Sequence, residues 1–230
     1  MHTGNGHQMV QPLYAADRED FREIVRLVRP GARVLDVGCG SGELLQLLRD
    51  EKQIDGRGIE IGAEGVSACL AKGLAVIQGD ADRDLAEYPP MSFDYAILSQ
   101  TLQAVRAPKE VLSNLLRLAE RAIVSFPNFG HWRVRMSLVT TGRMPDTRSL
   151  PIPWYETPNI HLCTLRDFTE LCAELNLRIE ASSAVSATAP ARSINCQSAM
   201  ENWRSESALF LLSRKSAATP PTHRPGDLFA

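Results

Sequence analysis

Residues 33–45 read Arg33-Val-Leu-Asp-Val-Gly-Cys-Gly-Ser-Gly-Glu-Leu-Leu45, and this stretch decides the fold. Its first part, residues 34–37, is a short run that is apolar apart from Asp36, as expected of a buried strand. Glycines then end the run, and leucines at helical spacing follow it. A strand, a glycine turn and a helix in this order bring backbone N–H groups and the positive end of a helix to one place. The sequence therefore predicts a ligand-binding turn at residues 38–42.

The spacing of the glycines indicates which ligand the turn accepts. Gly38, Gly40 and Gly42 form G-x-G-x-G, whereas the dinucleotide fingerprint is G-x-G-x-x-G. Asp36 lies two residues before the first glycine, where a negative charge suits an ammonium group better than a phosphate. This favours S-adenosylmethionine (SAM), which carries an α-amino group and a positive sulfonium. The segment resembles the first motif of class I SAM-dependent methyltransferases; the plainer alternative is a glycine-rich turn without a ligand.

Composition narrows the class of protein. The chain has 230 residues, fits one α/β domain by length, and is 44% hydrophobic. No apolar run approaches the roughly 20 residues needed to span a bilayer, and the N-terminus does not resemble a signal peptide. The five scattered cysteines indicate free thiols in a reducing cytoplasm. A net charge of -2 gives no global attraction to nucleic acid. We therefore expect a cytoplasmic protein that binds neither membrane nor nucleic acid.

Strand and helix patterns alternate through most of the chain. This predicts a doubly wound, mostly parallel seven-stranded sheet of the class I methyltransferase (Rossmann-like) type, with an antiparallel edge strand. The expected domain covers residues 15–213, between a flexible N-terminus (1–14) and a disordered tail (214–230). The expected strands are 34–37, 56–61, 75–78, 93–98, 122–126, 177–180 and 208–212. The expected helices are 15–28, 43–49, 63–72, 108–119 and 165–175.

Acidic residues at the ends of later strands extend the predicted cofactor site. Glu60 lies 20 residues beyond Gly40, where such folds place an acid against the ribose hydroxyls. Asp80 is a candidate for the adenine amino group, although Gly-Asp is also common turn chemistry. Gln100 follows the fourth strand, either beside the ligand or as a helix-start residue. The predicted cofactor-binding set is Asp36, Gly38, Cys39, Gly40, Gly42, Glu60, Ile61, Asp80, Ala81 and Gln100.

An insertion at residues 127–161 interrupts the fold between the fifth strand and the next helix. It is dense in aromatic residues, Pro, Asn, His and Arg, and loops at this edge commonly carry recognition. Its arginines are suited to an acidic small molecule, a partner surface or phosphate, or else form a solvated basic face. His131, Tyr155 and His161 are its candidate bases, although such residues are more often structural. No metal cluster is predicted, and the Asn-Pro-Pro-Tyr type motif of base-amine methyltransferases is absent.

Several insertion motifs together resemble one family. Asn128-Phe-Gly-His-Trp-Arg, Gly142-Arg-Met-Pro, Trp154-Tyr and Thr157-Pro-Asn-Ile-His161 are similar to the signature of the methionine biosynthesis protein MetW family. The resemblance covers roughly residues 20–180 and implies a class I methyltransferase fold. It also implies a partner, a homoserine O-acyltransferase (MetX-type), which needs the protein for activity. The predicted substrate or partner residues are His131, Trp132, Arg133, Arg135, Arg143, Trp154, Tyr155, Asn159 and His161.

Three functional hypotheses follow. The first is a subunit that binds SAM, or its product S-adenosylhomocysteine, and activates the acyltransferase. In that case SAM, as the downstream product of the methionine pathway, would signal that methionine is sufficient. The second is an active methyltransferase on a small acidic metabolite or a protein. The third is a fold that keeps the nucleotide pocket without using it.

Overall fold

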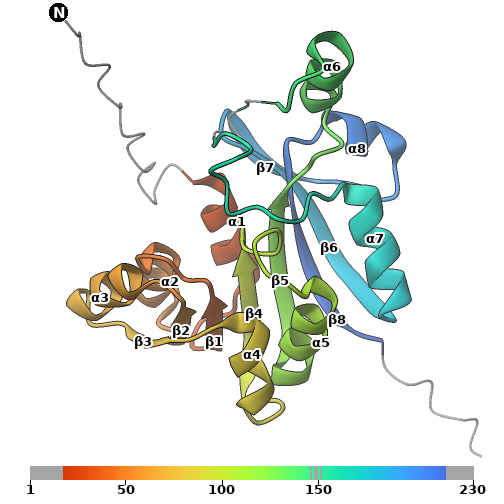
Figure 1. The fold of residues 1–230 in the computed structure, drawn as a ribbon. Coiled ribbons are helices and arrows are strands. Elements are labelled where there is room, and N and C mark those ends of the chain that lie inside the picture. The colour runs from red at the N-terminus through yellow and green to blue at the C-terminus, as the bar shows by residue number, and fades with distance from the viewer. Residues whose placement is uncertain (1–17, 146, 148–149, 151, 216–230) are drawn as a thin grey trace, which may run out of the picture.

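The computed structural model describes residues 18–145, 147, 150 and 152–215. The expected flexible N-terminus at 1–14 lies outside these residues, as does nearly all of the expected tail. Within them the chain forms one central sheet with helices on both faces (Figure 1). The strands are β1 (Arg33–Val37), β2 (Asp55–Glu60), β3 (Ala75–Gln78), β4 (Phe93–Ser99), β5 (Ala119–Pro127), β6 (Leu177–Ser186), β7 (Ala189–Ser193) and β8 (Ser207–Arg214).

The sheet has the order β3-β2-β1-β4-β5-β8-β6-β7. The first five strands pair in parallel, and β8, β6 and β7 join antiparallel to their neighbours. The expected doubly wound, mostly parallel sheet is confirmed, but it has eight strands instead of seven. The strand that the sequence did not reveal is β7, whose side chains are nearly all exposed.

The helices cover the two faces of the sheet and form two apolar cores. One core contains α1, α2 and α3, and the other contains α5 and α7. Alternate β1 residues point to opposite cores: Val34 packs with the first and Leu35 with the second. The helices are α1 (Glu19–Leu27), α2 (Glu43–Lys52), α3 (Ala63–Ala71), α4 (Ala81–Asp84), the 3-10 turn η2 (Leu85–Glu87), α5 (Pro108–Leu118), α6 (Trp132–Thr141), α7 (Leu165–Glu174) and α8 (Ala199–Arg204).

The direction of strand addition reverses at β1. Strands β2 and β3 extend the sheet on one side of β1, whereas β4 and β5 extend it on the other. In parallel sheets the loops on either side of such a reversal separate and leave a crevice at the carboxyl ends of the strands. The glycine turn follows β1 directly, so the topology places it at this crevice.

The insertion contains a helix, α6, that the sequence analysis did not predict. Of its side chains only Val134 is buried, and Figure 1 shows α6 standing away from the layers of the sheet. No helix in the described part of the chain is both long and apolar enough to cross a membrane. Nor do the described residues gather three or more His, Cys, Asp or Glu side chains in a way that would hold a metal ion.

Candidate cofactor site

The three glycines of the turn have left-handed backbone conformations, with φ of +73° at Gly38, +55° at Gly40 and +80° at Gly42. A Cβ atom on Gly38 would lie 2.6 Å from Cγ2 of Thr101. On Gly42 it would lie 2.5 Å from Cδ1 of Leu74. Backbone conformation at all three positions, and close packing at two, therefore require glycine.

Four of the five N–H groups of the turn, those of Gly38, Cys39, Gly40 and Gly42, donate within the protein instead of facing a ligand. Gly38 and Cys39 both donate to the carbonyl oxygen of Ile59, at 2.8 and 3.2 Å. Gly42 donates to the carbonyl of Cys39 at 2.9 Å, and Gly40 donates to the Glu60 carboxylate at 2.8 Å. A phosphate cradle needs several free N–H groups. The turn is therefore poorly suited to a pyrophosphate.

Glu60, at the end of β2, is directly joined to the glycine turn. Its Oε2 accepts the hydrogen bond from Gly40 N, and its Oε1 accepts one from Gly62 N, also at 2.8 Å. An ionised carboxylate has about four acceptor sites, so these two bonds fix its orientation and leave capacity for hydroxyl donors. The two parts of the site that the sequence predicted, residues 38–42 and Glu60, are thus in contact.

Asp36 lies beneath the turn as a buried carboxyl group, 2% exposed. Burial raises its pKa to about 7; the positive charge of Arg18 lowers this pKa, and the negative charge of Glu60 raises it. The neighbouring Cys39 side chain is also buried, and burial raises the pKa of its thiol. A cation bound near Asp36 would favour the ionised carboxylate.

A cavity of about 230 Å³ opens beside the turn, and we call it the glycine-turn cavity. Ile61 contributes a side chain that is 68% exposed, which is unusual for isoleucine. Four of the ten predicted cofactor residues line this cavity, and the other six do not: Asp36, Cys39, Gly40, Gly42, Glu60 and Gln100. The lining residues are Gly38, Ile59, Ile61, Gly79, Asp80, Ala81, Asp82, Thr101, Ala104, Val105 and Arg106.

Two neighbouring acids shape the wall of this cavity. Asp80 caps α4, with its side chain accepting from Asp82 N at 3.0 Å. Asp82 in turn accepts from the backbone N–H groups of Arg106 and Ala107, at 2.9 and 3.0 Å. Asp82 was not among the predicted cofactor residues, although it belongs to the same Gly-Asp-Ala-Asp turn as Asp80. Its role depends on a loop 24 residues away, which no local pattern reveals.

Gln100 acts through its backbone. Its φ is +52°, and its N–H donates to the Ser125 carbonyl oxygen at 3.0 Å. Its own carbonyl accepts from the Gln103 side chain at 2.8 Å. Gln100 therefore shapes the loop that closes the glycine-turn cavity, without lining it.

The second half of the insertion is attached to that same loop. Ile160 and His161 donate their backbone N–H groups to the Gln103 carbonyl, at 2.8 and 2.9 Å. The His161 Nε2 lies 3.2 Å from the carbonyl oxygen of Arg106, a residue that lines the cavity. Among the candidate bases, His161 thus contacts a residue of the cavity wall without lining the cavity itself.

The other predicted residues in the second half of the insertion are Trp154, Tyr155 and Asn159, and the first two are exposed to solvent. Trp154 and Tyr155 are about 70% and 69% exposed, and their rings meet edge to face at 5.7 Å. Asn159 donates its backbone N–H to the Thr157 hydroxyl at 3.1 Å. Tyr155 is accordingly an exposed residue and Asn159 a turn residue.

The first half of the insertion is attached to α8 through a buried asparagine. The Asn128 amide donates to the carbonyl oxygens of Asn202 and Ser205, at 2.9 and 2.8 Å, and its Oδ1 accepts from Gly130 N at 2.9 Å. The Arg135 guanidinium donates to the Gly130 carbonyl and stacks over the Trp203 ring, 5.4 Å from its centroid. Arg143, at the turn after α6, is exposed.

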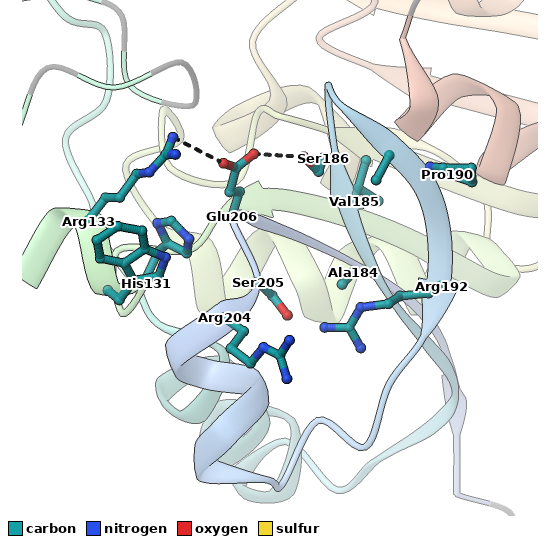
Figure 2. A pocket seen from close by; sticks show the side chains of 12 residues that line it. His131, Arg133, Ala184, Val185, Ser186, Pro190, Arg192, Arg204, Ser205 and Glu206 are labelled. Carbon is teal, nitrogen blue, oxygen red and sulfur yellow. Dashed lines mark hydrogen bonds and ion pairs between the residues drawn. The ribbon is translucent and has the colours of Figure 1, made fainter.

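A second cavity of about 240 Å³ lies between α6, β6, β7 and α8, and we call it the arginine cavity. Figure 2 shows Arg192 and Arg204 with their guanidinium groups toward one another, and Glu206 between Arg133 and Ser186. The lining residues are His131, Trp132, Arg133, Ala184, Val185, Ser186, Ala189, Pro190, Arg192, Arg204, Ser205 and Glu206. Of these residues, the sequence predicted His131, Trp132 and Arg133 in the insertion. The others come from distant segments and were not predicted.

The structure therefore separates the candidate bases. His131 is buried in the wall of the arginine cavity, and burial lowers the pKa of its imidazole. His161 contacts the carbonyl oxygen of Arg106 next to the glycine-turn cavity, and Tyr155 lies on the open surface. Because they do not converge, they form no acid–base pair.

A family model described as "Methionine biosynthesis protein MetW" matches residues 18–212. The chain is also 36% identical over 170 residues to the bifunctional methionine biosynthesis protein MetXA/MetW of Rhodopirellula baltica. That alignment covers 70% of this chain and 27% of the relative, so the chain spans about a quarter of the relative's length.

Solved structures share the fold at low sequence identity. An S-adenosylmethionine dependent methyltransferase from Mesorhizobium loti superimposes with a TM-score of 0.62 and 14% identity, covering 87% of this chain and 100% of that chain. A SAM-dependent methyltransferase from Thermotoga maritima, a possible histamine N-methyltransferase, gives a TM-score of 0.61 and 14% identity, covering 86% and 91%. These likenesses establish the class I methyltransferase fold. With the matching family model, they show that the chain belongs to the methionine biosynthesis protein MetW family.

Proposed function

We propose that the chain binds SAM in the glycine-turn cavity and regulates a homoserine O-acyltransferase of methionine biosynthesis. The observation that carries the cofactor proposal is the contact between Glu60 and the N–H of Gly40, because Glu60 directly precedes Ile61, which lines the cavity. It places an oriented carboxylate beside a cavity with an exposed apolar side chain, Ile61. A carboxylate suits a ribose diol, and an apolar side chain suits the face of an adenine ring.

The donor set of the site fits SAM better than a dinucleotide. Asp36, Glu60 and Asp80 place three carboxyl groups in or beside the site, and the turn N–H groups are used internally. These acids would repel a pyrophosphate, whereas the ammonium and sulfonium of SAM would stabilise their ionised forms. In this proposal Asp36 favours the cationic end, Glu60 holds the ribose, and Ile61, Asp80 and Ala81 surround the adenine. Bound SAM would supply an electrophilic methyl group.

The acyltransferase proposal is supported by the fused relative. In the MetXA/MetW protein of Rhodopirellula baltica, a region similar to this chain belongs to a much longer polypeptide whose name combines two activities. Fusion keeps two domains at high effective concentration, which favours their contact. We infer that this chain makes the corresponding contact with a MetX-type acyltransferase.

Purified acyltransferase assayed with and without the chain tests this proposal. We expect acyl transfer to homoserine to rise when the chain is added in equimolar amount, and the two proteins to co-elute in size-exclusion chromatography. Equal activity with and without the chain, together with separate elution, would contradict the proposal.

SAM is proposed to act as a feedback signal on this complex. A ligand changes a partner's activity only if it binds the free and complexed chain with different affinity. The same assay across physiological SAM concentrations therefore tests the signal. A SAM-dependent change in acyl transfer supports feedback, and equal activity at all SAM concentrations removes it.

Methyl transfer is the second candidate function, because the His161 imidazole lies 3.2 Å from the carbonyl oxygen of Arg106, a residue that lines the glycine-turn cavity. Methyl transfer needs alignment of the acceptor and sometimes a base. Incubation of the chain with SAM and cell extract should then produce S-adenosylhomocysteine, and His161→Gln should reduce its formation. Absence of S-adenosylhomocysteine above a no-protein control would favour the regulatory function.

A further inference from the structure

The exposed apolar side chains of this protein are concentrated in the insertion. Globular proteins rarely leave such side chains together on their surface unless a partner covers them. On α6 the exposed residues include Val139, at 81%, and α8 beside it exposes two more large apolar side chains. Those in the insertion are Trp132, Met136, Leu138, Val139, Met144, Ile152, Trp154, Tyr155 and Ile160, Leu162 follows the insertion directly, and those on α8 are Met200 and Trp203.

The base of α6 is held against α8, so this surface is formed before any partner arrives. The Asn128 side chain, 1% exposed, bonds two carbonyl groups at the end of α8, and Arg135 stacks on Trp203 of that helix. A preformed surface loses less conformational freedom on binding than a flexible one. The arginine cavity opens between these two helices and the β6–β7 hairpin (Figure 2).

The charge of the arginine cavity is unbalanced. Arg192 is paired with Glu201 through both of its terminal nitrogens, and Arg133 reaches Glu206 only at 3.9 Å. Arg204 forms no ion pair within the described residues, although the hydrogen bond from Arg192 and, to a smaller extent, the positive charge of Arg204 lower the pKa of the Glu201 carboxyl. Its guanidinium points toward that of Arg192 (Figure 2). A carboxylate between the two groups would relieve their repulsion and accept charge-assisted hydrogen bonds.

We propose that α6, α8 and the arginine cavity between them form the docking site for an acidic segment of the acyltransferase. One carboxylate of that segment enters the cavity between Arg192 and Arg204, and apolar side chains on either side of it cover Trp132 and Trp203. This arrangement matches the general form of interfaces, in which a pocketed anchor is surrounded by aromatic residues. The inference rests on the proposed function, since it names the surface through which the acyltransferase is bound.

The experiment compares Arg204→Glu with a matched control, Arg166→Glu. Arg166 lies on α7, its side chain is 79% exposed, and it is outside the arginine cavity. Affinity of each full-length variant for the acyltransferase is measured by calorimetry. Arg204→Glu is expected to bind about 30-fold more weakly or worse, because it replaces a cation by an anion at the anchor point. Arg166→Glu is expected to stay within about twofold of wild type, as exposed surface charges usually do.

Further readouts separate the possible failures. Unchanged SAM binding by Arg204→Glu shows that the variant is folded. If wild type binds the acyltransferase and Arg204→Glu binds equally well, the docking site is wrong and the proposed function stands. If wild type neither binds nor activates the acyltransferase, the proposed function itself fails, and the inference fails with it. If inorganic phosphate or succinate raises the thermal stability of wild type but not of Arg204→Glu, while binding of the acyltransferase is equal, the cavity is a small-anion site and the inference is overturned.

Discussion

The two sides of the sheet differ in how they form a site. On the side of β1 and β2, the backbone of the glycine turn is held in place by its left-handed glycines, by internal hydrogen bonds from its N–H groups and by the Glu60 carboxylate. On the side of β6, β7 and β8, the insertion and α8 present exposed apolar side chains around unbalanced arginines. The first side places a few polar groups in fixed positions, as small-molecule sites do. The second side exposes apolar side chains, as surfaces that bind macromolecules do.

The proposals above accordingly assign cofactor binding to the first side and partner binding to the second. The link between them is the second half of the insertion, which is bonded to the loop that closes the glycine-turn cavity. A ligand in the cavity would contact Thr101, Ala104 or Val105 on one face of this loop, while Gln103 holds Ile160 and His161. Because the two cavities share no lining residue, a substitution in one of them should mainly affect the binding event of that cavity.

The largest expected effect follows Gly42→Ala. The new Cβ would meet Leu74 at 2.5 Å and Cys69 at 2.7 Å, and the residue would keep a φ of +80°. We expect a loss of roughly 2–5 kcal/mol in the free energy of unfolding from strain and overpacking, together with loss of SAM binding. Urea unfolding and calorimetry measure these two effects.

Gly31→Ala is the matched control for that substitution. Gly31 also has a positive φ, +69°, but its Cβ would meet no atom within 4 Å, and it precedes β1 at the opposite end from the cavity. It should lose only about 1–2 kcal/mol and keep normal SAM affinity. Equal losses of SAM affinity in both variants would show that general destabilisation, not the turn, controls binding.

A smaller effect is expected for Glu60→Gln. The amide retains one acceptor oxygen but removes the charge, so one of the two hydrogen bonds to Gly40 and Gly62 is lost. We expect SAM affinity to fall about 10- to 100-fold, with acyltransferase affinity in the absence of SAM unchanged. Glu64→Gln, on exposed α3 surface, should leave both affinities unchanged.

The pH dependence of SAM binding should show the titration of Asp36. Its pKa is about 7 instead of 3.8, so its protonation contributes stability to the ligand-free protein at low pH, and this is lost as pH rises through about 7. A cation favours the ionised form, so SAM affinity should rise about three- to tenfold between pH 6 and pH 8.

Asp36→Asn provides the check on that profile. An amide does not titrate, so calorimetric affinities of this variant should be flat over the same range of pH. A rise in affinity that persists in Asp36→Asn would assign the titration to another group.

The smallest effect on folding is expected for Val139→Glu. This side chain of α6 is 81% exposed, so the free energy of unfolding should change by no more than about 0.5 kcal/mol. SAM affinity should not change, while affinity for the acyltransferase should fall a few-fold because a charge enters the edge of an apolar interface. A large loss of thermal stability would mean that Val139 is buried in the native protein, which would refute its assignment to the binding surface.

The sequence predicts the cofactor side of the molecule better than the insertion side. Strand β3 spans Ala75–Gln78 as predicted, and α1 (Glu19–Leu27) lies within the predicted helix 15–28. These elements follow periodicity because each has one face in the core. Helix α6 was missed because it buries only Val134 and exposes apolar residues on other faces, so no amphipathic stripe marks it.

Contacts between segments that are distant in the sequence also limit what the sequence can predict. The contact between Glu60 and Gly40 could be anticipated because parallel strands bring their carboxyl ends together. The bonds from Asp82 to the loop at 106–107, and the meeting of Arg133, Arg192 and Arg204, join segments tens of residues apart. The spacing of residues within one motif does not predict such contacts, because they depend on the path of each loop between strands and helices.

Calorimetric titration of the full chain with SAM, S-adenosylhomocysteine and NAD tests the central claim most directly. The account predicts one SAM or S-adenosylhomocysteine bound per chain and no binding of NAD, because the turn offers carboxylates instead of free N–H groups. Binding of NAD, or no binding of SAM and S-adenosylhomocysteine, would contradict it.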